Sequence, residues 1–248
     1  MATIPSFPPI HFDFGAIQEL PGELAKRGVD HPLIITDQGL VEHGVYQKLR
    51  DALPADMAVA VYDNIPENPT IAGIEQALDV YKANNCDGII GLGGGSVLDS
   101  GKALRVAATH NMSVIEILNN LGKITADVAP YITIPTTAGT GAEITFGGGI
   151  HPETNAPALT IRSIHVQPDL AICDPEFTMT LPPRLTAATG MDAMTHCVEG
   201  FVSNMSNPPC EAIALDGTRR VVDFIERAVA DGSDREARAE MSMAALQG

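Results

Sequence analysis

The chain is poor in positive charge and in long apolar stretches. Its 248 residues include 15 Lys and Arg against 31 Asp and Glu, which gives a formal net charge of −16. This excess of negative charge argues against binding to the phosphate backbone of DNA or RNA and against an anionic membrane surface. No stretch approaches 18 unbroken apolar residues, so no membrane span is expected. We therefore expect neither a nucleic acid nor a membrane as a partner.

Cysteine is scarce and scattered. Cys86, Cys173, Cys197 and Cys210 form no C-x-x-C pair, which argues against a zinc knuckle or a disulfide framework and fits a reducing compartment. Residues 1–9 lack the basic and continuous apolar regions of a signal peptide. We therefore expect a cytoplasmic protein. The hydrophobic content of 45% predicts a globular core rather than disorder.

Short apolar runs alternate with helical patterns through the first two thirds of the chain. Strands are predicted at residues 33–36, 57–62, 88–92 and 131–134, and helices at 40–52, at 71–83 and from Ser96 onward. Strands separated by helices of this length indicate a mostly parallel sheet covered on both faces. Ligands of such a sheet bind beyond the carboxyl ends of its strands.

The pattern changes from about residue 143 onward. β-prone pieces occur at 144–146, 159–161 and 170–172, and helices are predicted at 184–203, 209–230 and 234–247. We predict an α/β fold in which a mostly parallel nucleotide-binding sheet domain, residues 1–180, precedes the beginning of an all-helical domain, residues 181–248. Helix 209–230 has more apolar surface than two companion helices would cover, so we expect the helical domain to be incomplete.

A glycine-rich loop follows the predicted strand at 88–92. Residues 91–102 read Gly-Leu-Gly-Gly-Gly-Ser-Val-Leu-Asp-Ser-Gly-Lys. Glycines let the backbone approach a pyrophosphate closely, and the free N–H groups of a helix start favour an anion. Ala103 stands where a Walker A loop needs Ser or Thr, so this is a different kind of phosphate loop. The alternative is a plain strand-to-helix turn with surplus glycine; we favour a nucleotide site.

A second loop of small polar residues follows the strand at 131–134. Residues 135–143 read Pro-Thr-Thr-Ala-Gly-Thr-Gly-Ala-Glu. Hydroxyl groups between glycines supply neutral hydrogen-bond donors for ribose, amide or pyrophosphate groups. The alternative is a simple surface loop; the glycine loop nearby favours a ligand site.

Asp192 and His196 stand four residues apart on a predicted helix, so both side chains emerge from one face. An acid and an imidazole at this spacing can hold two positions of a divalent metal. The alternative is an ordinary ion pair on a helix surface.

Together these segments resemble the iron-containing (group III) alcohol dehydrogenases. The matching motifs are G-G-G-S-x-x-D-x-x-K at 93–102, P-T-T-A-G-T-x-x-E at 135–143 and G-x-D-A-x-x-H at 190–196. Residues 35–40 and 67–70 also match family patterns. The resemblance runs from about residue 10 to residue 248, with the motifs in the family's order.

The resemblance implies a two-domain oxidoreductase that uses NAD and a divalent metal, iron or zinc. The cofactor-binding residues that it implies are Asp37, Asn68, Gly94, Gly95, Ser96, Asp99, Thr136, Thr137 and Thr140. Gly94, Gly95 and Ser96 would bind the pyrophosphate, and the three threonines would line the cofactor cleft. Asp37 would face the adenosine ribose, where a carboxylate accepts hydrogen bonds from a 2′-hydroxyl but repels a 2′-phosphate. Asp99 would lie toward the substrate end.

Asp192 and His196 would be catalytic metal ligands in this resemblance, which implies hydride transfer between an alcohol and NAD. The family supplies two further histidines from later helices, and His196 is the last histidine of this chain. A catalytic site needs about three protein ligands, so we expect this form to be inactive or weakly active. The family has a lysine that contacts a ribose. At the matching positions, residues 155–158, this chain has no lysine. We also expect a small-molecule alcohol or aldehyde substrate and a homo-oligomer.

Three other functions remain open from the sequence. A maleylacetate reductase shares much of the motif pattern. A lyase or cyclase of the dehydroquinate synthase group shares the architecture and uses NAD transiently. A non-enzymatic chain would bind only nucleotide or a partner.

Overall fold

The computed structural model describes residues 6–204 and 207–248. The strands are β1 (Ile10–Phe12), β2 (Pro32–Ile35), β3 (Ala60–Tyr62), β4 (Gly88–Gly93), β5 (Tyr131–Pro135), β6 (Gly147–Ile150), β7 (Leu159–Arg162) and β8 (Leu170–Cys173). The α-helices are α1 (Leu20–Lys26), α2 (Gln38–Glu42), α3 (Val45–Ala52), α4 (Ile71–Ala83), α5 (Gly95–Ala107), α6 (Val114–Asn119), α7 (Pro183–Val202), α8 (Pro208–Ala230) and α9 (Arg235–Gln247).

Six strands form one parallel sheet in the order β1-β8-β5-β4-β2-β3. The chain moves outward from β2 to β3 and then returns to the other side of β2 to form β4, so the strand order reverses between β2 and β4. In open parallel sheets a crevice forms outside the carboxyl ends of the strands at such a reversal. The residues after β2, β4 and β5 therefore meet at one edge of the sheet.

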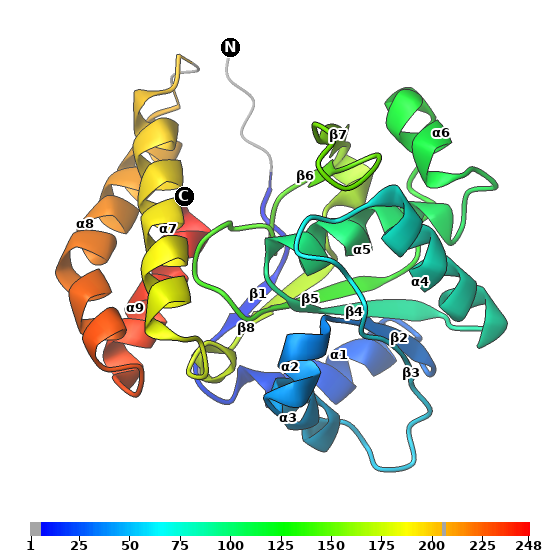
Figure 1. Cartoon of the computed structure of the whole chain (residues 1–248), viewed down its shortest axis with the longest axis horizontal. Coiled ribbons are helices and arrows are strands. Elements are labelled where there is room, and N and C mark those ends of the chain that lie inside the picture. The colour runs from blue at the N-terminus through cyan, green and yellow to red at the C-terminus, as the bar shows by residue number, and fades with distance from the viewer. Residues whose placement is uncertain (1–5, 205–206) are drawn as a thin grey trace.

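Hydrophobic side chains alternate between the two faces of the sheet. Leu33 and Ile89 pack against α4, α5 and α6, whereas Ile34 and Ile90 pack against α1 and α3. Figure 1 shows these two groups of helices on opposite sides of the strands. Every residue of β2 is buried, because helices cover both faces of the sheet. This explains why the sequence of β2 is an unbroken apolar run. The predicted fold class, a mostly parallel sheet followed by helices, is confirmed.

Helices α7, α8 and α9 stand together beside the sheet (Figure 1). They enclose a small core that includes Ala193, Val221 and Met241, and Ala138 from the loop after β5 belongs to the same cluster. This contact fixes α7 against the edge of the sheet where the loops gather. The division at residue 180 stays a prediction, although each element after that residue in the described part is a helix.

Several predicted boundaries were wrong. The helix expected at 40–52 is two helices, α2 and α3, because Gly44 adopts a left-handed conformation (φ 76°) between them. The strand expected at 57–62 is only Ala60–Tyr62. Residues 144–146 are not a strand: a turn covers 142–144, and the neighbouring strand consists of Gly147, Gly148, Gly149 and Ile150. Glycines have a low β-propensity, so pairing with β7 decides this strand rather than its composition.

Among residues 6–204 and 207–248, no helix is long and apolar enough to cross a membrane.

Candidate functional site

The glycine loop joins β4 to α5 at the centre of the sheet. Helix α5 begins at Gly95, one residue before the predicted Ser96. A Cβ atom at Gly95 would lie 2.9 Å from Cγ2 of Thr140, and one at Gly94 would lie 3.3 Å from Cγ2 of Thr137. The loop therefore needs glycine because the loop after β5 packs directly on it. The hydroxyl of Ser96 donates a hydrogen bond to the carbonyl oxygen of Glu67.

The threonine loop begins where β5 ends. The backbone N–H of Thr136 donates to the carbonyl oxygen of Gly93 at 3.1 Å, so the two loops are joined by their main chains. Thr136 is buried, whereas Thr140 is exposed and its hydroxyl oxygen accepts the N–H of Ala142 at 3.2 Å. The hydroxyls are thus spread along the edge of the crevice.

Asp37 follows β2 and caps helix α2. Its Oδ1 accepts the backbone N–H of Leu40 at 3.0 Å. It lines a cavity of about 550 Å³, which we call the Asp37 cavity, together with Gly94, Thr136 and Thr137.

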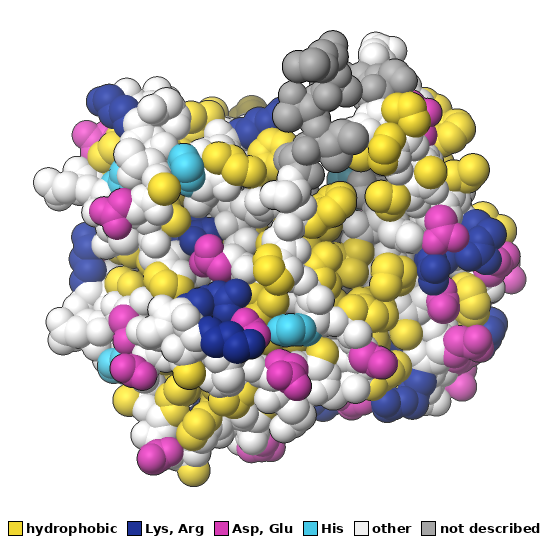
Figure 2. Space-filling view, turned by 180° about the vertical axis from the view of Figure 1, so that it is seen from behind, with side chains coloured by type: hydrophobic (Ala, Val, Ile, Leu, Met, Phe, Trp, Pro, Cys, Tyr) yellow, Lys and Arg dark blue, Asp and Glu magenta, His cyan; other side chains and the backbone are white. Residues whose placement is uncertain are grey.

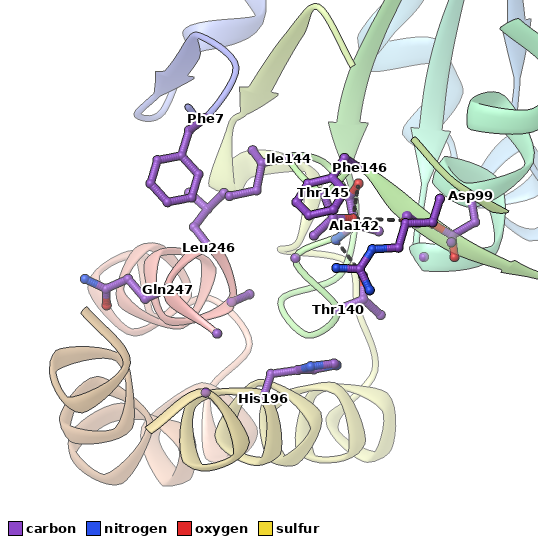
Figure 3. Close-up of a pocket in the computed structure, with 18 of the residues that line it drawn as sticks. Phe7, Asp99, Thr140, Ala142, Ile144, Thr145, Phe146, His196, Leu246 and Gln247 are labelled. Atoms are coloured by element: carbon purple, nitrogen blue, oxygen red, sulfur yellow. Dashed lines mark hydrogen bonds between the residues drawn. The ribbon is translucent and has the colours of Figure 1, made fainter. Parts of the chain in front are cut away.

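A second cavity, of about 720 Å³, lies on the other side of the glycine loop. Asp99, Thr140 and His196 line it, so we call it the His196 cavity. Figure 3 shows His196 on α7 facing Thr140 and Asp99 across this space. Ser96 lines both cavities. The two cavities are therefore adjacent at the start of α5, and we refer to them as the two lobes of the cleft. From behind, hydrophobic side chains gather between the helices and the rest of the molecule (Figure 2).

The side chain of Asp99, on helix α5, holds the β6–β7 hairpin by a hydrogen bond. Its Oδ2 accepts the backbone N–H of Gly149 at 2.9 Å, and its Oδ1 lies 3.0 Å from Nζ of Lys102. The Lys102 ammonium is fully buried and also donates to Oγ1 of Thr145 and to the carbonyl oxygen of Gly147, both at 2.7 Å. Burial lowers the pKa of Lys102, while Asp99 opposes that shift.

Glu143 lies buried near this network. Burial raises its pKa to about 7, although a hydrogen bond from its own backbone and the charge of Lys102 act in the opposite direction. Glu143 therefore titrates near neutral pH, where an exposed glutamate is already ionised.

Asp192 and His196 emerge from one face of α7, as the spacing predicts. Oδ1 of Asp192 lies 3.6 Å from Nε2 of His196, and the two side chains are 41% and 42% exposed. Within the described residues, no group of three or more His, Cys, Asp or Glu side chains could hold a metal ion. The pair thus offers two donors of the right chemistry and lacks a third.

The remaining site residues differ in their positions. Asn68 is exposed and lies between Glu67, which lines the Asp37 cavity, and Pro69, which lines the His196 cavity.

Arg162, at the end of β7, lines the His196 cavity, and it was not predicted from the sequence. The alternation of Thr160 and Arg162 on a strand was the available signal, because both side chains lie on the face opposite to buried Ile161.

Comparison with known proteins gives matches along almost the whole chain. The family model of iron-containing alcohol dehydrogenase matches residues 8–175, and that of the family's C-terminal region matches residues 186–247. The 4-hydroxybutyrate dehydrogenase of Cupriavidus necator is 43% identical over 100% of this chain and 65% of its own length. Alcohol dehydrogenase 4 of Schizosaccharomyces pombe is 37% identical over 99% of this chain and 58% of its own length.

Solved structures agree with these matches. Sulfoacetaldehyde reductase from Bifidobacterium kashiwanohense, solved in complex with NAD+, superposes with a TM-score of 0.93 at 30% identity. The match covers 100% of this chain and 66% of that one. The chain thus spans 58–66% of the length of these relatives. Two family models that together cover most of its residues show that the chain belongs to the iron-containing alcohol dehydrogenase family.

Proposed function

We propose that this chain provides the NAD-binding unit and part of the metal site of an oxidoreductase that interconverts an alcohol and an aldehyde. The family membership supports a dehydrogenase over a lyase of the dehydroquinate synthase group. We expect the complete protein to act in the cytoplasm as a homo-oligomer.

The observation that carries this proposal is the two-lobed cleft over the glycine loop. A dinucleotide has two ends joined by a pyrophosphate, and the cleft has two cavities that are adjacent at Ser96. In our proposal the adenosine lies in the Asp37 cavity and the pyrophosphate binds the amides of Gly94, Gly95 and Ser96. The threonines of residues 136–140 and the segment at Asn68 border the cofactor, and the nicotinamide reaches Asp99. The neighbour solved in complex with NAD+ supports NAD as the cofactor.

Asp192 and His196 are the proposed metal ligands. A carboxylate and an imidazole suit iron and zinc alike. Both side chains are partly exposed, and the imidazole lines the His196 cavity. A bound divalent metal would supply the positive charge that polarises the substrate oxygen. A catalytic site needs about three protein ligands, so we expect the chain by itself to lose the metal readily and to turn over alcohol only weakly.

The chain's own residues would orient the reactants. The amides at the start of α5 fix the pyrophosphate, and the Gly139 backbone packs against Asp192, whose Oδ2 would lie 3.1 Å from a Cβ atom there. Asp99 and Lys102 hold the β6–β7 hairpin, which would form one wall of the lobe that receives the substrate and the nicotinamide. NAD would supply the acceptor for the hydride from the substrate carbon.

Calorimetric titration with NAD+ and NADP+ tests the nucleotide site. We expect NAD+ to bind more tightly, because a 2′-phosphate beside the Asp37 carboxylate should cost on the order of 1–3 kcal/mol. Asp37→Asn keeps an oxygen to cap α2 but removes the charge. It should bring the two affinities to within about threefold, and equal affinities in the wild-type chain would show that Asp37 does not face the ribose.

Titration with Zn²⁺ tests the metal site separately. We expect weak binding that His196→Ala weakens further, because two protein donors leave the remaining positions to water. Tight binding that disappears in His196→Ala would contradict the proposed shortage of ligands.

A further inference from the structure

One arginine in the His196 cavity has no carboxylate partner. Arg162 ends β7, is exposed, and its Cζ lies 5.2 Å from the centre of the Phe146 ring. In the described part of the chain, no carboxylate lies within ion-pairing distance of it, whereas Arg105 pairs with Asp169 at 2.8 Å. The guanidinium is thus available to a ligand in the cavity.

The hairpin gives this side chain open space. Arg162 pairs with Gly147 across the antiparallel ladder, so no side chain stands opposite it. A Cβ atom at Gly147 would lie 4.0 Å from Cγ of Arg162, which places the arginine stem over bare backbone. On the other face of β7, Ile161 is fully buried and holds the strand in place.

Among the described residues that line the cavity, Arg162 is the cation without a carboxylate partner. The Asp99 carboxylate is neutralised by Lys102, and His196 faces Asp192. The protein carries a net charge of −16, which repels anions from most of its surface. An anionic ligand that enters this lobe would therefore meet a guanidinium that no neighbouring carboxylate neutralises.

We propose that Arg162 binds the carboxylate of the substrate, so that the preferred substrates are alcohols or aldehydes with an acidic group at the far end. This inference rests on the proposed function, because the substrate must share the His196 cavity. A guanidinium offers two parallel N–H donors that match the two oxygens of a carboxylate. A phosphate of the dinucleotide has the same chemistry, and the experiment separates the two sources.

The test compares 4-hydroxybutyrate with 1,4-butanediol, which differ in having a carboxylate or a hydroxymethyl group at one end. Binding of each is measured by calorimetry with and without saturating NAD+, and NAD+ binding is measured first. We expect Arg162→Met to weaken binding of the acid about tenfold or more and to change binding of the diol and of NAD+ less than twofold. Arg162→Lys should recover part of the loss. Lys123→Met removes an exposed charge elsewhere and should change none of the three.

Two results would overturn the proposal. If Arg162→Met weakens NAD+ as much as the acid, the arginine binds a cofactor phosphate. If the wild-type chain binds acid and diol equally, or binds neither, the arginine does not select an anion. Failure to bind NAD+ contradicts the proposed function alone, since the acid and the diol are also compared without it. Unfolding curves confirm that the exposed substitutions leave the fold intact.

Discussion

Among single residues, Glu143 combines deep burial with a pKa near neutrality. Its pKa of about 7 lies above the ordinary 4.5 because burial disfavours the charged carboxylate. Between pH 4.5 and 7 the folded chain therefore keeps a proton that the unfolded chain has released. The unfolded state binds fewer protons in this range, so the free energy of unfolding falls as pH rises.

We expect this effect to cost up to about 3 kcal/mol of stability between pH 4.5 and 7. Urea unfolding at pH 5 and at pH 7.5 measures it in the wild-type chain and in Glu143→Gln, which cannot ionise. The variant should lose less stability between the two values. Glu153→Gln changes an exposed glutamate and should behave like the wild type. Parallel losses in all three proteins would mean that Glu143 is not the group that titrates.

At the scale of helices and strands, helix α5 packs closely on the sheet because two glycines leave room for the side chain of one tyrosine. Tyr131 is fully buried, and its hydroxyl donates to the carbonyl oxygen of Leu98 at 2.9 Å. A Cβ atom at Gly101 would lie 2.3 Å from Cζ of this ring, and one at Gly91 would lie 2.5 Å from its hydroxyl oxygen. Helix α5 can lie this close to β4 and β5 only without side chains at those positions.

Gly101→Ala should destabilise the chain by about 1–3 kcal/mol, because the ring has no space to move. Gly22→Ala is the matched control: it also lies in a helix, and its Cβ atom would meet nothing within 4 Å. The control should be neutral or stabilise by up to about 1 kcal/mol, since alanine favours the helix. Thermal unfolding measures the stability of both variants. If Gly101→Ala leaves the stability unchanged, helix α5 can shift away from the ring.

The sequence predicts elements well where local signals and packing agree. Thr70 caps helix α4, and the spacing of its apolar residues predicts the helix. The glycine loop follows the end of β4, as expected. Strand β6 could not be predicted, because three glycines form a strand only by pairing with β7 and by contacts of Asp99 and Lys102 with the hairpin. Arg162 was missed for the same reason: its place in the cavity depends on how that hairpin docks.

Over the whole molecule, apolar side chains on α7 and α8 remain uncovered. Phe201 is 48%, Val202 67%, Leu215 57% and Val222 64% exposed. Monomeric proteins rarely expose apolar patches larger than a few hundred Å². This surface therefore favours contact with another polypeptide over contact with water.

We expect the 248-residue chain to self-associate through this surface. Sedimentation velocity over a range of concentrations should show species larger than the monomer. Leu215→Lys combined with Val222→Lys should weaken association at least about tenfold, because burial of each side chain is worth about 1.5–3 kcal/mol. Ile164→Lys changes an equally exposed side chain outside these helices and should have little effect. A wild-type chain that stays monomeric at every concentration would contradict this expectation.

The cleft with two lobes also has a consequence for inhibitor chemistry. Because Ser96 borders both cavities, two weak fragments, one in each lobe, would bind with their near ends close together. A short tether would then turn the second binding event into an intramolecular one at an effective concentration of about millimolar. Fragment pairs joined across the start of α5 should therefore gain affinity far beyond that of either fragment alone.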